Sequence, residues 1–244
     1  MTDEEIRRGL RRKTRRSFLT GGVAAAAGWA GYQWLTSARA DNALPWPQRR
    51  VLDFNGKLSH SYLSDSHLMP TYSASEVGYL KPNGAIGLDD SDEWSLHVAP
   101  GDGIPALELR LADIQGLPRV EMITRFCCIE GWSVVAHWTG ARFSDFTRKY
   151  LPPNAAVPPY VYMATPGEDY YVGLDRKSAL HPQTLLAYER NGRPLTAEHG
   201  APLRLVIPVK YGIKSIKKIG VIRYTAQKPG DYWAEEGYDW FAGL

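Results

Sequence analysis

The sequence changes character near residue 40, and this division decides how much of the chain is left to fold as a domain. Residues 14–19 read TRRSFL, which fits the twin-arginine export pattern. A weakly apolar run rich in Gly and Ala follows, and residues 38–40 (ARA) form a small-x-small cleavage site. The sequence therefore predicts a leader over residues 1–40 and one folded domain over residues 41–244.

The same leader leaves a second possibility open. Residues 18–38 carry no charged side chain, and this length is close to the roughly 20 residues that span a bilayer. An uncleaved anchor is therefore an alternative to a cleaved peptide. Both forms predict a periplasmic protein or one held at the outer face of the cytoplasmic membrane. Because the twin-arginine route carries folded proteins, commonly with a cofactor already inserted, the leader also favours a buried cofactor.

The basic surplus of the chain belongs to the leader. The whole chain has 29 Lys/Arg and 26 Asp/Glu, a formal charge of +3. Residues 1–40 hold eight of the basic and three of the acidic side chains, which leaves 21 basic and 23 acidic in the remainder. A nucleic-acid-binding protein keeps its basic surplus in the folded part. The charge distribution therefore excludes nucleic acid as a partner.

Short alternating segments dominate the chain after residue 92. They predict strands at residues 93–98, 120–126, 160–165, 170–173, 202–208 and 219–224. Two other segments predict short helices, at residues 109–117 and 143–150. Because strands outnumber helices and are unevenly spaced, the pattern predicts an α+β fold with mixed β-sheets and short helices.

Two stretches before the first predicted helix have less regular patterns. Residues 41–82 are polar and interrupted by four prolines, which predicts loops and short extended pieces. Residues 89–93 (DDSDE) form an acidic run whose spacing does not fit a calcium loop. We interpret this run as a solvated turn.

The chain has two cysteines, and they are neighbours, Cys127 and Cys128. Adjacent cysteines can form a disulfide only through a strained ring, and neither has Cys or His at zinc-like spacing. Three interpretations follow from the residues alone. One is a catalytic thiol with His137, His181 or His199 as its base. The others are a thiolate ligand to a soft metal and two buried thiols that act as small apolar side chains.

Two longer motifs resemble a known family. Residues 125–133 (RFCCIEGWS), followed by WTG at 138–140, are similar to the metal-binding segment of the sulfite-oxidase-fold molybdopterin oxidoreductases. Within that family they most resemble the catalytic subunits of bacterial periplasmic protein-methionine-sulfoxide reductases. Residues 181–185, 199–205 and 208–217 are similar to the family in the same order. The resemblance covers the chain from Trp94 to the C-terminus and is poor before it.

The resemblance implies a sulfite-oxidase-like fold with one molybdenum-pyranopterin cofactor per chain. The family's pattern places its metal-ligating cysteine on Cys128. The residues implied to bind the cofactor are Thr71, Ser75, Cys128, Thr165, His199, Arg204, Ser215, Ile216 and Lys217. Thr71 and Ser75 rest on the poorly matching region. Related proteins have Asn at the position of His199 and Pro at the position of His137.

Two charged residues beside Cys128 are candidates for catalysis. Glu130 could exchange a proton next to the metal or make a structural hydrogen bond to the backbone. Arg125 could neutralise an anionic metal site or pair with a carboxylate.

The family's chemistry is two-electron oxygen-atom transfer. The resemblance implies reduction of a sulfoxide or another oxo substrate, either a small molecule or a protein side chain, with sulfite oxidation as the alternative within the class. The sequence lacks the Cys-x-x-Cys-His pattern of haem attachment, so we expect a separate electron-transfer partner, a membrane haem protein or a soluble cytochrome. A thiol enzyme and a non-catalytic binding module are the alternatives outside the class.

The C-terminal residues 231–241 are dense in aromatic and acidic side chains. They predict either an exposed docking surface for the electron partner or a segment that wraps the core.

Overall fold

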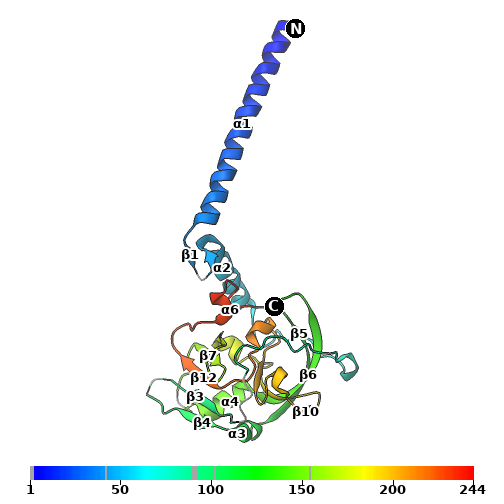
Figure 1. The fold of residues 1–244 in the computed structure, drawn as a ribbon, viewed down its shortest axis with the longest axis vertical. Helices are drawn as coiled ribbons and strands as arrows, with labels where there is room; N and C mark the ends of the chain where they lie inside the picture. Colours follow the sequence, from blue (N-terminus) through cyan, green and yellow to red (C-terminus); the bar gives the residue numbers. More distant parts are fainter. Residues whose placement is uncertain (1–2, 42, 89–92, 102, 154) are drawn as a thin grey trace. The chain divides into compact units, whose positions relative to one another are not determined.

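The computed structural model describes residues 3–41, 43–88, 93–101, 103–153 and 155–244. The chain divides into two compact units, Met1–Val51 and Leu52–Leu244. The first unit contains the long helix α1 (Asp3–Ser37) and the paired strands β1 (Ala40–Asp41) and β2 (Leu44–Pro45) (Figure 1). Over the described residues, no helix combines the length and the apolar character that crossing a bilayer requires.

A 17-residue helix, α2 (Trp46–Tyr62), occupies part of the stretch that we predicted as loops. That prediction was wrong because prolines were taken as breakers. Pro47 lies in the first turn of the helix, where its missing N–H has no partner to lose and its fixed φ suits the helix. After α2, the described residues up to 82 form no named strand, and the short 3₁₀ turn η1 (Ala74–Glu76) lies among them.

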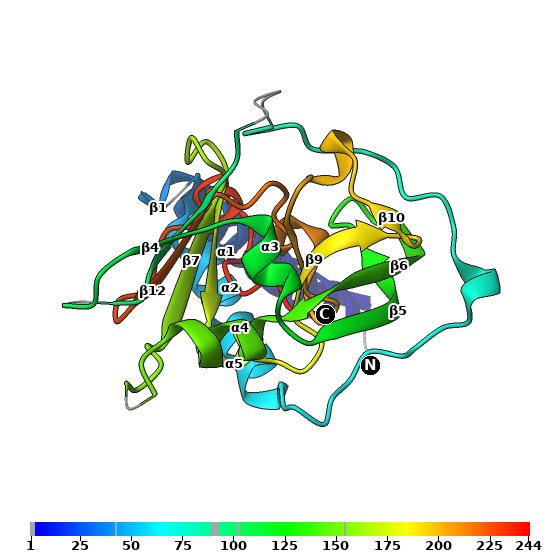
Figure 2. The ribbon, with the colours of Figure 1, turned by 90° about the horizontal axis from the view of Figure 1, so that it is seen from below.

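The first sheet is antiparallel, and its strands lie side by side in Figure 2. Its strand order is β10-β9-β6-β5, and β11 also pairs with β9. The strands are β5 (Arg119–Cys127), β6 (Ser133–Arg142), β9 (Leu185–Arg190), β10 (Arg193–Pro194) and β11 (Arg204–Val206). The predicted strand at residues 120–126 is confirmed as β5, and the one at 202–208 is confirmed in shorter form as β11. The sequence analysis missed β6 and β9.

The second sheet is mixed, with the order β4-β3-β12-β7-β8. Strands β12 and β3 are parallel, and the other pairs are antiparallel. The strands are β3 (Leu96–Ala99), β4 (Leu107–Leu109), β7 (Tyr160–Ala164), β8 (Tyr171–Asp175) and β12 (Val221–Thr225). Four predicted strands are confirmed here as β3, β7, β8 and β12, and the α+β class with mixed sheets is confirmed with them.

Short helices and 3₁₀ turns lie between the strands or follow the last one. They are α3 (Leu111–Gln115), α4 (Phe143–Tyr150), α5 (Arg176–Ala179), η2 (Ala197–His199), η3 (Gly212–Lys214) and α6 (Tyr232–Glu235). Of these, α3, α4, α5 and η3 connect one sheet to the other. The predicted helix at residues 143–150 is confirmed as α4. The one at residues 109–117 is shorter, since Leu109 ends β4 before α3 begins.

Alternating side chains of β9 divide between two apolar cores. Leu186 and Tyr188 belong to a large core that also contains Met163 and Ile222 of the second sheet. Leu185 and Ala187 belong to a smaller core around Trp138. This division follows from the two-residue period of a strand. The smaller core lies under the candidate site.

Gly140 allows β6 and β9 to approach closely. The register of these strands shifts between Thr139 and Gly140. A Cβ on Gly140 would lie 2.1 Å from the carbonyl oxygen of Leu186, so only glycine fits there. The glycine of the WTG motif is therefore explained by backbone packing.

The C-terminal segment packs on the core. Phe241 and Ala242 are buried, and the buried Asp231 forms an ion pair with the buried Lys214. These contacts favour the core-wrapping interpretation over an exposed docking surface. Residues 89–92 of the predicted acidic turn lie outside the described residues.

Candidate functional site

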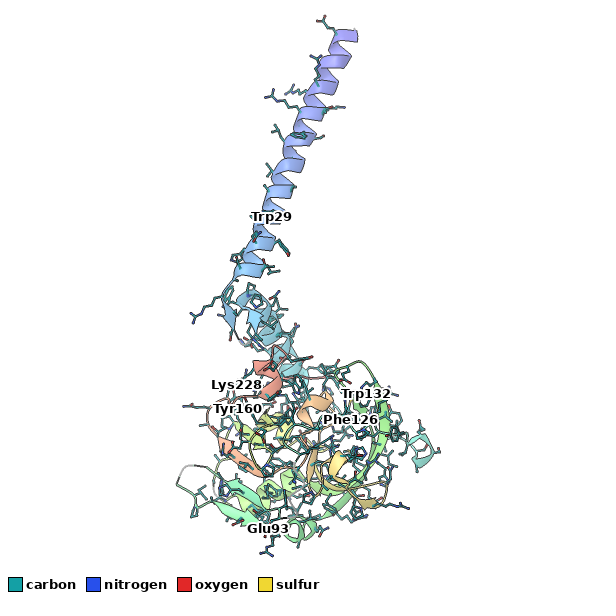
Figure 3. The ribbon with its side chains drawn as sticks, in the orientation of Figure 1. Trp29, Glu93, Phe126, Trp132, Tyr160 and Lys228 are labelled. Atoms are coloured by element: carbon teal, nitrogen blue, oxygen red, sulfur yellow. The ribbon has the colours of Figure 1, made fainter. Side chains whose placement is uncertain are left out.

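The β5–β6 hairpin places the two cysteines differently. Cys127 ends β5 opposite Ser133 and is half-buried. Cys128 begins the connecting turn, in which its N–H donates to Trp132 O (2.9 Å) and its carbonyl accepts from Gly131 N (3.1 Å). Gly131 has φ +91°, a conformation that favours glycine. The turn puts Cys128 in the wall of a cavity that Phe126 also lines. The rings of Phe126 and Trp132 lie near each other (Figure 3), with centroids 6.0 Å apart.

The cavity has a volume of about 220 Å³ and brings together residues from distant parts of the chain. Five predicted site residues line it: Cys128, Glu130, His199, Arg204 and Lys217. The opposite walls come from residues 80–86 and from the aromatic side chains of Tyr170, Trp233 and Tyr238.

Glu130 lies beside the Cys128 thiol. The Cys128 Sγ is 3.7 Å from the Glu130 Oε2. The same oxygen accepts from Trp132 Nε1 (2.9 Å) and from Asn83 Nδ2 (3.4 Å). Among the described residues, Glu130 is therefore held by side-chain donors and not by the backbone.

Arg204 lies buried at another part of the cavity wall. Only 2% of its surface is exposed. Its guanidinium donates to the carbonyls of His199 (3.0 Å) and Ser215 (3.1 Å) and lies 4.8 Å from the Trp138 ring centroid. Burial, together with Arg190, lowers the pKa of Arg204 to about 9. Among the described residues, no carboxylate lies within ion-pair distance of it.

Lys217 and His199 extend this positive region. The Lys217 ammonium donates to the carbonyls of Asn83 (2.7 Å) and Gly84 (2.9 Å). Burial and the charge of Arg204 lower its pKa to about 8. Burial and the nearby cations lower the pKa of His199 to about 4. Its Nδ1 is buried and has no hydrogen-bond partner in the described part of the chain.

Burial lowers the pKa of all three basic groups, and a neighbouring cation lowers it further in each of them. Such a cluster fits an anion. A phosphate group matches the guanidinium fork, the ammonium charge and the free imidazole nitrogen. The cavity therefore combines a thiol at one wall with an anion-binding region at another.

Other predicted residues support this region without lining the cavity. The Ser215 carbonyl holds Arg204, and the Ile216 carbonyl accepts from Leu205 N (2.8 Å). Thr165 is fully buried, and its hydroxyl accepts from Tyr170 N (3.2 Å).

Three predicted residues lie together elsewhere, along β5. Arg125 stacks on Tyr72 at 5.2 Å from the ring centroid, and Thr71 pairs with Thr124 of β5. Ser75 is exposed, and its hydroxyl is 2.8 Å from that of Ser73. The structure does not bring these residues into the cavity.

The sequence analysis missed Asn83, which contacts both parts of the site. Its amide nitrogen lies 3.9 Å from the Cys128 Sγ, and its carbonyl accepts from Lys217. A Pro-Asn-Gly turn at residues 82–84 was the available signal. The thiol-enzyme alternative requires an imidazole base beside the Cys128 thiol. The polar neighbours of this thiol are Asn83 and Glu130, and no described contact joins it to His137, His181 or His199.

Comparison with known proteins agrees with this geometry. The family described as oxidoreductase molybdopterin binding domain matches residues 83–233. A putative protein-methionine-sulfoxide reductase subunit YedZ1 from Azospira oryzae is 39% identical over 141 residues, covering 54% of this chain and 50% of the relative. The protein-methionine-sulfoxide reductase catalytic subunit MsrP of Xanthomonas campestris is 40% identical over 155 residues, covering 57% and 47%.

One solved structure shows the same fold. The sulfane dehydrogenase SoxCD from Paracoccus pantotrophus aligns with a TM-score of 0.51 at 18% identity, covering 59% of this chain and 41% of that one. This chain spans about half the length of the curated relatives it matches.

Proposed function

The chain belongs to the molybdopterin-binding oxidoreductase family, and on this basis we propose that it reduces a sulfoxide or a related oxo substrate with one molybdenum-pyranopterin per chain. The similar proteins are protein-methionine-sulfoxide reductase subunits, which supports sulfoxide reduction over sulfite oxidation.

A single observation carries the cofactor assignment. One cavity holds a thiol and three basic side chains, of which Arg204 is buried with no carboxylate within ion-pair distance among the described residues. Cys128 would bind the metal as a thiolate. Arg204, Lys217 and the Nδ1 of His199 would hold the anionic end of the pterin.

When bound, the molybdenum centre supplies two-electron oxygen-atom transfer. The chain's own residues supply the rest. Glu130, beside Cys128, can take up or release the protons that accompany loss of the oxygen as water. Trp132 and Asn83 fix the orientation of its carboxylate. Tyr170, Trp233 and Tyr238 form an apolar wall that limits access of water.

The proposal includes export and an electron partner. The TRRSFL motif supports export by the twin-arginine route to the periplasm or to the outer face of the cytoplasmic membrane. A membrane haem protein or a soluble cytochrome would then exchange electrons with the cavity.

Metal analysis combined with two assays tests the proposal. Protein exported by its native route should contain about one molybdenum and one pterin per chain. Reduced dye should be consumed with methionine sulfoxide, and sulfite should not reduce the oxidised protein at a comparable rate. Turnover without molybdenum that alkylation abolishes would instead indicate a thiol enzyme. Absence of both pterin and turnover would indicate a binding module.

A further inference from the structure

A continuous series of aromatic rings runs from the cavity to the second sheet. Tyr238 and Trp233 line the cavity, and their ring centroids are 5.3 Å apart. Trp233 lies 5.3 Å from Tyr232, and Tyr232 lies 6.1 Å from Tyr171. These separations are those of directly interacting rings.

The series ends at a pair of tyrosines on neighbouring strands. Tyr171 of β8 stacks on Tyr162 of β7, with centroids 5.8 Å apart. Tyr170, which lines the cavity, also contacts Tyr232 at 5.4 Å. Two residues of the cavity wall, Trp233 and Tyr170, thus each contact Tyr232, which in turn contacts Tyr171 of the pair.

Both tyrosines of the pair donate to carboxylates. The Tyr171 hydroxyl donates to Glu235 (2.5 Å), and the Tyr162 hydroxyl donates to Glu168 (2.9 Å). Glu168 also forms an ion pair with Arg223, and 38% of the Glu168 side chain and 45% of the Arg223 side chain are exposed. The hydrogen bond to Glu235 raises the pKa of Tyr171 to about 12, so its phenol is neutral at pH 7.

Tyr170 differs from the pair in its partner. Its hydroxyl donates to the backbone carbonyl of Ile213 (2.5 Å), which is not a proton acceptor at neutral pH. A phenol loses its proton when it loses an electron, so a carboxylate within transfer distance lowers the free energy of oxidation. Oxidation is therefore easier at Tyr162 and Tyr171 than at Tyr170.

We propose that these rings form a one-electron relay, which carries oxidising equivalents from the cavity mouth to the Tyr162–Tyr171 pair. A one-electron oxidant of the outer-sphere type, such as a photogenerated ruthenium(III) complex, removes one electron. The O–H bond of the pair's tyrosine breaks, and its proton forms an O–H bond with Glu235 or Glu168. The products are a neutral tyrosyl radical, a carboxylic acid and the reduced oxidant. The relay would spare a bound cofactor from such oxidants, and it does not depend on the proposed substrate.

The relay can be tested by trapping the radical in the full-length protein. The protein is illuminated with tris(bipyridine)ruthenium and a sacrificial acceptor in the presence of a nitroso spin trap, and the adducts are located by peptide mass spectrometry. In the wild type, we expect adducts mainly on Tyr162 and Tyr171. The double variant Tyr162→Phe/Tyr171→Phe should move them to Tyr238 and Trp233, whereas the control Tyr150→Phe should leave the pattern unchanged. Tyr150 is a suitable control because its hydroxyl donates to the Asp113 backbone carbonyl.

A second variant tests connection through the middle of the series. Tyr238 is 39% exposed, so an oxidant at the cavity mouth can react there directly. Tyr232→Leu should interrupt the contact between Tyr238 and the Tyr162–Tyr171 pair, and the amount of spin adduct on Tyr238 should then rise several-fold. An unchanged circular dichroism spectrum would show that the variant is folded. Equal Tyr238 adducts with and without Tyr232 would overturn the relay. Adducts spread over exposed tyrosines in the wild type, without preference for the pair, would also overturn it.

Discussion

Cys127 and Cys128 are adjacent in the chain and chemically identical, but their side chains lie in different environments. Cys128 faces the cavity beside Glu130, whereas Cys127 closes β5 opposite Ser133. Burial raises the pKa of the Cys127 thiol, which disfavours its thiolate. The geometry therefore supports Cys128 as the metal ligand that the sequence motif indicated.

We predict that Cys128→Ser loses molybdenum, whereas Cys127→Ser retains most of it. A serine hydroxyl binds a soft metal poorly. Of the two cysteines, Cys128 lines the cavity and Cys127 does not. X-ray absorption at the molybdenum edge and dye-linked turnover measure the difference. Equal loss in both variants would contradict the assignment.

Arg204 combines complete burial with a positive charge that no described acid neutralises. We predict that Arg204→Ala lowers the ratio of cofactor to protein about tenfold or more, since charge-assisted hydrogen bonds contribute about 1.5–3 kcal/mol. The control is Lys177→Ala, because Lys177 donates to the His60 carbonyl and does not line the cavity. Similar molybdenum content in the two variants would argue against phosphate binding by Arg204.

His199 should make the cofactor-free protein sensitive to acid. Its folded-state pKa of about 4 lies below the ordinary value near 6.5, so the unfolded chain binds more protons between these values. The free energy of unfolding is therefore not reduced by His199 above pH 6.5, where the imidazole is neutral in both states. It decreases as the pH falls from 6.5 toward 4, because the unfolded chain takes up the proton first. We expect the melting temperature to fall less between pH 7 and pH 5 in His199→Asn than in the wild type.

The control for this titration is His97→Asn, because the His97 side chain is exposed on β3. It should retain the wild-type dependence on pH. If His199→Asn also kept that dependence, the buried imidazole would not be the titrating group.

At the scale of elements, the C-terminal segment is part of the structure of the second unit. The N–H of Tyr211 donates to the Ala242 carbonyl (2.9 Å), and the N–H of Leu244 donates to the Val209 carbonyl (3.2 Å). Together with the Lys214–Asp231 ion pair, these bonds fix α6 and place Trp233 in the cavity wall. The segment therefore links the stability of the fold to the shape of the site.

We predict that Phe241→Ala lowers the free energy of unfolding by about 3–5 kcal/mol, the usual cost of removing a buried phenylalanine. Phe241 is 7% exposed, whereas Tyr238 in the same segment is 39% exposed. Tyr238→Ala should therefore cost much less. Denaturant titration compares the two, and an equal cost would show that the segment does not pack through Phe241.

At the scale of the whole molecule, the proposed export signal and the proposed cofactor site point to the same kind of protein, one that is exported after its cofactor has been inserted. We propose that residues 1–40 carry an export signal, and the cavity of the second unit would accept a cofactor that is inserted before export. We predict that Arg15→Lys/Arg16→Lys abolishes delivery to the periplasm, because the route recognises the arginine pair and not the charge alone. Arg11→Lys/Arg12→Lys, outside the motif, should be exported normally. Cell fractionation measures both, and equal export would contradict a twin-arginine signal.

The sequence alone predicted six of the twelve strands in the described part of the chain and the helix at residues 143–150, and its motif register proposed Cys128 as the metal ligand. These features depend on short-range rules, the two-residue period of strands and the spacing within one motif. It failed at α2, where Pro47 occupies a helix start that is indistinguishable in sequence from a loop. It also missed β6 and β9, which the pairing of distant strands completes.

Only the tertiary structure decided which candidate residues meet. Asn83 and Lys217 are 134 positions apart and share a hydrogen bond, while Arg125, three residues from Cys128, lies outside the cavity. The buried, uncompensated charge of Arg204 likewise follows from the elements that enclose it. Contacts of this kind are set by how whole sheets and turns pack, and no local pattern specifies the other side of a cavity.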